Sequence, residues 1–412
     1  MIPGLVRQPG PFRVYWAGQT ISLFGDQVSL IALPLVAVLV LHAGPAEMGY
    51  LVAAAWLPSL LFGLHAGAWV DRYRRRRLLM IAADIGRALL LATVPVAAAL
   101  HALTFVQLLA VVFINGTLSM LFNMSAQILF VSTVPKERYV EGMSLLNGSR
   151  AFSFVSGPTV GGLLVQALSA PVALVADAIS FIGSAVSLAM IAPAEPAAES
   201  ERRGQVLAGI RFVLGAPVMR AALASTATIN LFNLAYGALV VLYIVRSLHV
   251  PPSTLGLVLG SGAVGGLIGS LITAPLGRRI GIGPAFLLGC ILFPAPLLLV
   301  PLAGGPMPVV LALLFLSQFG AGLGVMILDI SVGAIFAALI PDQLRARVAG
   351  AYSVVNYGVR PVGALLGGAL GAAIGTRPTL LLVTIAAIAG FLWLLPSPIR
   401  RMKTLPDSAK MA

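Results

Sequence analysis

The segment Gly67-Ala-Trp-Val-Asp-Arg-Tyr-Arg-Arg-Arg-Arg77 sets five arginines and one aspartate between two long apolar runs. Of the 412 residues in the chain, 59% are hydrophobic and only 9% are charged, whereas soluble globular proteins carry about 25% charged residues. Apolar runs of about 20 residues recur on both sides of the segment, and each is long enough to cross a hydrocarbon core of roughly 30 Å. This composition excludes a soluble fold and predicts an all-α membrane protein.

The apolar runs predict twelve transmembrane helices. Several of them contain proline and many glycines, which membrane helices tolerate because neighbouring helices re-satisfy the freed backbone groups. The expected spans are 15–41, 47–70, 78–100, 104–131, 142–167, 171–192, 219–245, 253–276, 284–303, 307–334, 346–374 and 376–395.

The basic residues predict the orientation of these spans. Of the 26 Lys and Arg residues, 21 fall on one side, which the positive-inside rule assigns to the cytoplasm. An even number of spans then places both termini in the cytoplasm of a multi-pass protein of the plasma membrane. The net charge of +13 therefore follows from topology, and no nucleic-acid partner is needed to explain it.

The two halves of the chain repeat one another at a fixed offset of 206 residues. The repeat predicts a six-helix half at 1–192, a linker with a short amphipathic helix at 193–218, a second six-helix half at 219–396 and a tail at 397–412. Transporters built this way hold their substrate between the halves, near the bilayer midplane. The matched residues are Pro135 and Pro341, Gly157 and Gly363, Gly161 and Gly367, and Gly162 and Gly368.

These residues resemble the major facilitator superfamily over nearly the whole chain. The opening segment is similar to the loop signature of that superfamily, Gly-x-Leu-Ala-Asp-Arg-x-Gly-Arg-Lys, although Trp69 and Arg74 replace the usual Leu and second Gly. The stretches YWAGQTISLFGDQVSLIALPLVA (15–37) and DAISFIGSA (177–185) look like the branch of macrolide and enterobactin-type exporters. The signature positions that match are Gly67, Asp71, Arg72, Arg75 and Arg76.

The resemblance implies that Asp71 and the arginines of the loop form a cytoplasmic gate, which bridges the two halves when the outward side is open. An anion at Asp71 would also favour the positive N-terminal end of a facing helix. The alternative is that the arginines only snorkel to the headgroups and fix topology. We assign the gate to Asp71 and Arg72, and topology alone to Arg74 and Arg77.

The fifth span carries Gly157-Pro158-Thr-Val-Gly161-Gly162, similar to the core of the antiporter motif in drug exporters. The match is partial, since two upstream glycines of that motif are Ser144 and Ser153 here, and the usual motif arginine of the fourth span is missing. Small residues let helices approach closely and proline kinks a helix. The resemblance implies a helix that seals the transport path, and the alternative is ordinary helix packing.

Asp26 lies about 18 Å along the first span by helix rise, close to the midplane. An ionisable group at that depth is costly unless it is paired or faces water. A carboxylate there can take up and release a proton, as a proton-coupled exporter requires. We therefore predict Asp26 as the main protonation or cation-binding site. The alternative is a structural acid neutralised by Arg150 or Arg360, which are also deep in their spans.

Four other ionisable residues lie within spans. Asp84 and Arg87 are spaced i,i+3 and are expected to pair on one face of the third span, near the cytoplasmic end, where we count them among the gate residues. Asp177, in the outer half of the sixth span, is a candidate for a second proton or substrate carboxylate. Asp329 is expected to belong to the gate.

The polar residues of the expected cavity are few among Leu, Val, Phe and Met, which favours large amphiphilic substrates over sugars. The chain has no phosphate-binding Gly-Lys-Ser/Thr loop and no paired Cys or His set, so we expect no ATP hydrolysis, metal or cofactor. We expect a monomeric, proton-coupled exporter of hydrophobic or amphiphilic small molecules in the lipid bilayer. The alternatives are a nutrient facilitator or importer, and a membrane enzyme or receptor. The expected cavity residues are Gln27, Asn230, Asn233, Tyr236, Gln318 and Asn356.

Overall fold

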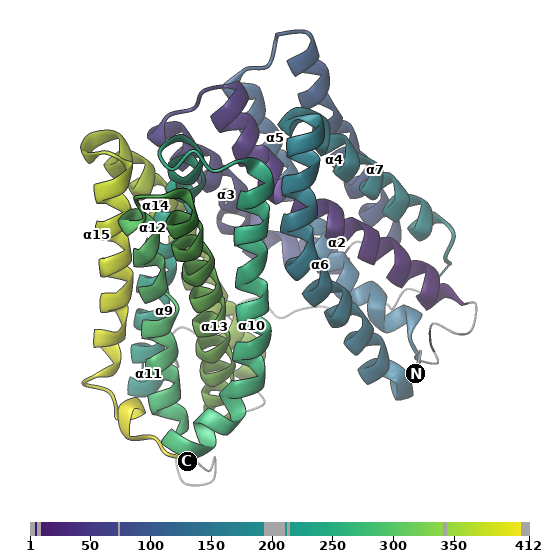
Figure 1. The fold of residues 1–412 in the computed structure, drawn as a ribbon. Coiled ribbons are helices and arrows are strands. Elements are labelled where there is room, and N and C mark those ends of the chain that lie inside the picture. Colours follow the sequence, from purple (N-terminus) through teal and green to yellow (C-terminus); the bar gives the residue numbers. More distant parts are fainter. Residues whose placement is uncertain are drawn as a thin grey trace. The chain divides into compact units, whose positions relative to one another are not determined.

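The computed structural model describes residues 5, 10–72, 75–192, 211, 215–340 and 344–404. In these residues the fold is helical, with twelve helices long and apolar enough to cross a membrane (Figure 1). The prediction of an all-α protein with twelve spans is confirmed. Helices prevail because no water reaches the bilayer core, so each backbone N–H and C=O must be satisfied within its own segment.

Most spans are single helices, but proline residues interrupt the ninth span. The ninth span is interrupted at Pro294 and Pro296, which have no N–H to donate to the preceding turn. The helices and helical turns are α2 (Pro11–Leu35), η1 (Val36–Val40), α3 (Pro45–Arg72), α4 (Arg76–Ala99), α5 (Phe105–Thr133), η2 (Lys136–Arg138), α6 (Tyr139–Leu168), α7 (Ala170–Ala189), α9 (Pro217–Arg246), α10 (Pro252–Ile280), α11 (Ile282–Leu292), η3 (Ala295–Leu298), α12 (Leu299–Leu302), α13 (Met307–Leu339), α14 (Arg345–Ile374), α15 (Thr376–Ile388), η5 (Ala389–Leu394) and η6 (Pro398–Arg401).

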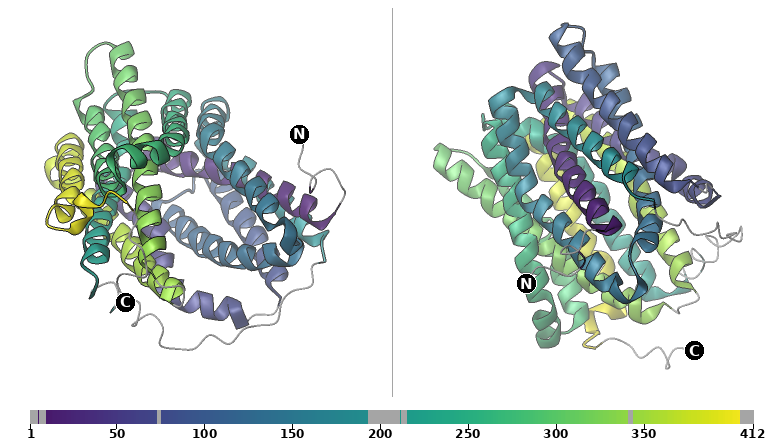
Figure 2. Two further views of the ribbon diagram at one scale, coloured as in Figure 1. Left: turned by 90° about the horizontal axis from the view of Figure 1, so that it is seen from below. Right: turned by 90° about the vertical axis from the view of Figure 1, so that its right-hand side faces the viewer.

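The first of two compact units comprises Met1–Ala43, Ala54–Glu201 and Pro251–Gly260. Within it α2 packs against α6 and α7, and α4 packs against α5 and α7. In Figure 2 the purple ribbon of α2 can be followed beside the blue and teal ribbons of α6 and α7. One apolar cluster of this unit contains Phe12, Tyr15, Met80, Phe122 and Phe130.

The second unit comprises Gly44–Ala53, Arg202–Val250 and Ser261–Ala412. Here α9 packs against α14 and α15, and α11 packs against α13. One apolar cluster of this unit contains Phe286, Cys290, Leu328, Ile335 and Ile399, so the segment that follows the last span contributes to the core.

Glycines set the distance between α10 and α13 in the second unit. A Cβ added at Gly265 would lie 2.0 Å from the carbonyl oxygen of Phe319, and one added at Gly322 would lie 1.8 Å from the carbonyl oxygen of Gly262. These neighbours are backbone atoms that cannot rotate away. Membrane helices gain most of their association energy from such close packing, since lipid tails are as apolar as leucine.

Gly265→Ala should therefore separate α10 from α13 and destabilise the protein by about 1–3 kcal/mol, the usual range for overpacking. Gly266→Ala is the matched control, because its added Cβ would meet only the side chain of Met326 at an ordinary 3.4 Å and the carbonyl oxygen of Gly322 at 3.5 Å. The measurement is the thermal unfolding midpoint of both variants in the same detergent. Equal midpoints for the two variants would contradict this account of the packing.

Candidate functional site

An ion network joins the first and third spans. The Nη1 of Arg87, on α4, lies 3.8 Å from the Oδ1 of Asp26, on α2. The Nη2 of Arg87 also donates a hydrogen bond to Asp84 one turn earlier on α4, which confirms the predicted i,i+3 pair. The side chains of Arg87 and Asp84 are 2% and 0% exposed, whereas that of Asp26 is 41% exposed. Asp26 is therefore the accessible end of an otherwise buried network.

Two aromatic rings hold the guanidinium of Arg87 in place. Its Cζ lies 3.9 Å from the ring centroid of Phe181 on α7 and 4.6 Å from that of Phe122 on α5. Its Nη1 also donates to the hydroxyl of Ser119 at 3.3 Å. Arginine suits this position because its planar cation stacks on aromatic faces while its edges donate hydrogen bonds. Three helices besides α2 thus orient one cation toward Asp26.

Asp177 on α7 is the third acid of the same region. Its side chain is fully buried and accepts hydrogen bonds from Ser29 on α2 and, at 3.0 Å, from Ser180. It interacts electrostatically with both Asp26 and Arg87. Gly25 makes this approach possible, because a Cβ there would lie 2.2 Å from the Oδ1 of Asp177. Asp177, predicted as a second carboxylate, therefore lies in the same site as Asp26.

We call Asp26, Asp84, Asp177 and Arg87 the acidic cluster. With every group ionised, its three carboxylates and one guanidinium would leave two negative charges uncompensated. Charge buried at membrane depth is expensive unless it is neutralised. A proton or a positively charged ligand would compensate part of this excess.

In the structure, the ionic partner of Asp26 is Arg87, which differs from the two arginines expected from the sequence. The two arginines offered there were Arg150 and Arg360, but the described ion pair is made by Arg87. Arg150 is exposed on α6 and acts electrostatically on Tyr15. Arg360 lies in the second unit, with its Cζ 4.5 Å from the ring centroid of Tyr357.

The glycines of the antiporter-like motif face two different helices. On α6, Gly157 and Gly161 meet α2 directly after Asp26: added Cβ atoms would lie 2.4 Å from the Cβ of Gln27 and 3.2 Å from the Cα of Val28. Gly162 faces the first turns of α10, where its Cβ would lie 2.5 Å from the Pro252 carbonyl oxygen. Pro158 is buried within α6. Gly157 and Gly161 of the motif therefore pack against the part of α2 that carries Asp26.

The loop signature is described only in part. Gly67, Asp71 and Arg72 lie in the last turns of α3, but their side chains are outside the described residues, so the gate stays a prediction. Arg75 is exposed and precedes α4, while the Arg76 side chain is 3% exposed. The Nη1 of Arg77, to which the sequence assigned only topology, donates to the carbonyl oxygen of Ile191 beyond α7.

In the second unit, polar groups of α9 and α14 bond to one another. The amide of Asn230 donates to the side-chain oxygen of Asn356 at 3.0 Å. The hydroxyl of Tyr352 donates to Thr226 at 2.9 Å. Sequence reasoning brought neither Tyr352 nor Thr226 forward, although the repeat places Thr226 over Thr20, which bonds α6 through Ser149 at 2.8 Å.

The remaining predicted residues of the second unit are dispersed. Asp329, on α13, is exposed and acts electrostatically on Arg360. Asn233 and Gln318 are half-buried, and Tyr236 is 4% exposed. The contacts described for this unit do not bring these five residues into one hydrogen-bonded set.

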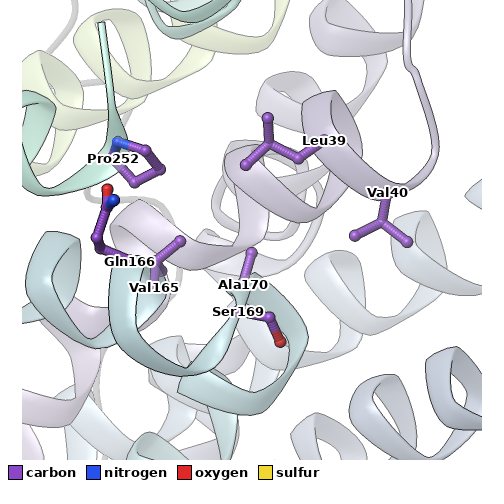
Figure 3. Close-up of a pocket in the computed structure, with 7 residues that line it drawn as sticks. All are labelled: Leu39, Val40, Val165, Gln166, Ser169, Ala170 and Pro252. Atoms are coloured by element: carbon purple, nitrogen blue, oxygen red, sulfur yellow. The ribbon is translucent and has the colours of Figure 1, made fainter.

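Described residues of the first unit line two surface hollows. The smaller, of about 240 Å³, contains one amide, that of Gln166, which accepts from the hydroxyl of Ser253 at 3.4 Å (Figure 3). The larger, of about 450 Å³, is mostly apolar and reaches Gly25 and Ser180 beside the carboxylate of Asp177. The smaller hollow is lined by Leu39, Val40, Val165, Gln166, Ser169, Ala170 and Pro252.

Comparison with known proteins gives a consistent result over the whole chain. A family model described as transmembrane secretion effector matches residues 6–411. The chain is 26% identical over 375 residues to the multidrug efflux pump Tap of Mycolicibacterium fortuitum, covering 88% of this chain and 89% of that protein. It is 28% identical over 360 residues to the uncharacterized MFS-type transporter YfiS of Bacillus subtilis, covering 85% and 81%. Among solved structures, the nucleoside transporter NupG matches with a TM-score of 0.73 at 13% identity, covering 94% and 98%, which is a likeness of fold alone.

Loss of the Arg87 cation should destabilise the fold more than loss of the Asp26 charge. Arg87→Gln leaves the fully buried Asp84 without its partner, and breaking a buried pair costs about 3–5 kcal/mol. Asp26→Asn should cost less, because that side chain is accessible. The measurement is the thermal unfolding midpoint in detergent, with exposed Arg150→Gln as the matched control. Adding Asp84→Asn to Arg87→Gln should recover part of the loss, and equal midpoints for Arg87→Gln and Arg150→Gln would refute the assignment.

Proposed function

The chain belongs to the transmembrane secretion effector family of major facilitator transporters, and on that premise we propose that it exports hydrophobic or amphiphilic small molecules in exchange for protons, by alternating access. Relatives named multidrug efflux pumps support the export of drug-like compounds. The class of protein follows from the family itself: this is a multi-pass membrane transporter and not an enzyme.

Proton coupling rests on one observation, the accessible carboxylate of Asp26 at 3.8 Å from a buried guanidinium. Protonation of Asp26 would remove its ionic contact with Arg87. The hydrogen-bonded pair of Arg87 and Asp84 would stay intact. A carboxylate can therefore gain or lose its proton here without exposing an unpaired buried cation. Asp26 is the exchanging group in this proposal, and Arg87 is its resident counter-ion.

The excess of acids over bases supports lipophilic cations as one substrate class. A cation entering beside the acidic cluster would replace a proton as the compensating charge, so binding of one would favour release of the other. The apolar hollow that reaches Gly25 and Ser180 offers hydrocarbon contact next to Asp177. Competition of this kind is the simplest physical basis for exchange.

The internal repeat supports assigning the coupling to the first half. At the offset of 206 residues, Cys290 stands over Asp84, Phe293 over Arg87 and Val383 over Asp177. The second half keeps the fold but replaces these charges with a thiol and two hydrocarbon side chains. The second half therefore has no counterparts of Asp84, Arg87 and Asp177 at the corresponding positions.

The test is proton-driven flux in proteoliposomes that hold the purified full-length protein. Wild type should move lipophilic cations against their gradient when a pH gradient is imposed. Asp26→Asn should reduce this flux to the level seen without the pH gradient, while downhill movement of the substrate persists. Glu137→Gln is the matched control, because Glu137 is an exposed carboxylate on η2, outside the acidic cluster.

Two results would reject proton-coupled export, and a third would reject Asp26 as the exchanging group. Substrate flux in wild type that ignores the pH gradient would identify a facilitator. Accumulation in the opposite direction under the same gradient would identify an importer. Retention of full coupling in Asp26→Asn would keep an exporter but move the proton site elsewhere.

A further inference from the structure

The chain after the last span is bound to the second unit along Ser397–Lys403, which we call the C-terminal strap. Ile399 is 0% exposed and belongs to the core formed with Phe286 and Leu328. The carbonyl oxygen of Met402 accepts a hydrogen bond from the backbone N–H of Gly283 at 2.9 Å. The strap is thus held by both packing and hydrogen bonding.

Two glycines at the start of α11 form the seat of the strap. A Cβ at Gly283 would lie 1.7 Å from the carbonyl oxygen of Ile399, so only glycine permits this contact. Gly281 has φ of +100°, a conformation that side chains disfavour, and its Cβ would lie 2.9 Å from the Cα of Lys403. The seat therefore fixes the backbone of the strap against the turn that follows α10.

The fixed strap points its charges outward. Ile399 is buried and Met402 half-buried, whereas Arg400, Arg401 and Lys403 are exposed. Two further exposed cations, Arg278 and Arg279, lie in the last turn of α10, directly before the turn that the strap contacts. In the described parts of the chain, no ion pair involves any of these five cations.

The position of these cations relative to the spans identifies their partner. Arg278 and Arg279 end the span Pro252–Ile280, and the strap begins three residues after the span Thr376–Leu394. All five cations therefore lie where apolar helices give way to polar chain, which is the level of lipid headgroups. Basic residues at this level attract anionic lipids, with a gain that grows with each Lys or Arg.

We propose that the C-terminal strap and the end of α10 together form a binding surface for anionic phospholipid headgroups. The five cations converge on one surface because the strap contacts the α10–α11 turn at Gly281 and Gly283. A fixed backbone also lowers the ordering cost of binding, compared with a free basic tail. The proposal is independent of the transport cycle, so either can fail without the other.

The experiment reconstitutes the full-length protein in phosphatidylcholine vesicles that contain increasing fractions of brominated phosphatidylglycerol. Bromine quenches tryptophan fluorescence on contact, and Trp393, which is 54% exposed, lies four residues before the strap. The part of the quenching that Trp393→Phe removes measures the preference for anionic lipid. Replacing Arg400, Arg401 and Lys403 by glutamine should weaken this preference by roughly 100-fold.

Two controls and one substitute variant separate this surface from general charge effects. Arg400→Lys with Arg401→Lys keeps the charge and should keep the preference. Neutralising three exposed cations of the first unit, Arg13, Lys136 and Arg138, should leave the Trp393 signal unchanged. If the strap variant does not fold, Arg278→Gln with Arg279→Gln replaces it and should weaken the preference by roughly 30-fold.

Three outcomes would overturn the proposal. The first is an unchanged preference in the neutralised variant that folds. The second is an equal loss in the first-unit control, which would mean that total charge alone matters. The third is displacement of the lipid by excess inorganic phosphate but not by chloride of equal ionic strength, which would indicate a site for soluble phosphate.

Discussion

Burial of the Arg87 guanidinium imposes the strongest constraint on the first unit. A cation in an apolar helical interior must be neutralised, stacked and hydrogen-bonded, because its desolvation penalty otherwise exceeds the stabilisation from packing. Asp84 neutralises it, Phe122 and Phe181 stack on it, and Ser119 accepts from it. These partners come from α4, α5 and α7, so one side chain fixes three helices and presents a charged edge to Asp26. The carboxylate of Asp26 therefore faces a guanidinium whose position is fixed by α4, α5 and α7.

The two repeats preserve packing more strictly than charge. Gly157 faces Gln27 on α2, and its counterpart Gly363 faces the carbonyl of Leu231 on α9, with a Cβ distance of 2.0 Å. Close helix contact needs the same small residue in both halves. The positions of Asp84 and Arg87 carry no such requirement, since Cys290 and Phe293 fill the equivalent space with neutral groups. An internal duplication can thus keep one architecture while only one half carries the acidic cluster.

The two repeats also differ in the segment that follows their second span. The first repeat carries Asp71 in its signature loop, whereas Gly277 stands at that position in the second. There the C-terminal strap seats its backbone on Gly281 and Gly283, where no side chain would fit. The second unit thus uses backbone contacts at this end, and Arg278 and Arg279 remain exposed in the last turn of α10.

The sequence by itself determined the twelve spans and the pairing of Asp84 with Arg87, because hydrophobic length and helical period are local properties that one segment expresses alone. It also singled out Asp26 and Asp177 as costly acids within spans. Only the tertiary structure decided that Arg87 is the partner of Asp26 and that Ser29 bonds to Asp177 across two helices. No period links residues on different helices, so their contacts depend on which helix faces meet. That choice is made by packing at positions such as Gly25, whose sequence context does not indicate which side chain it will face.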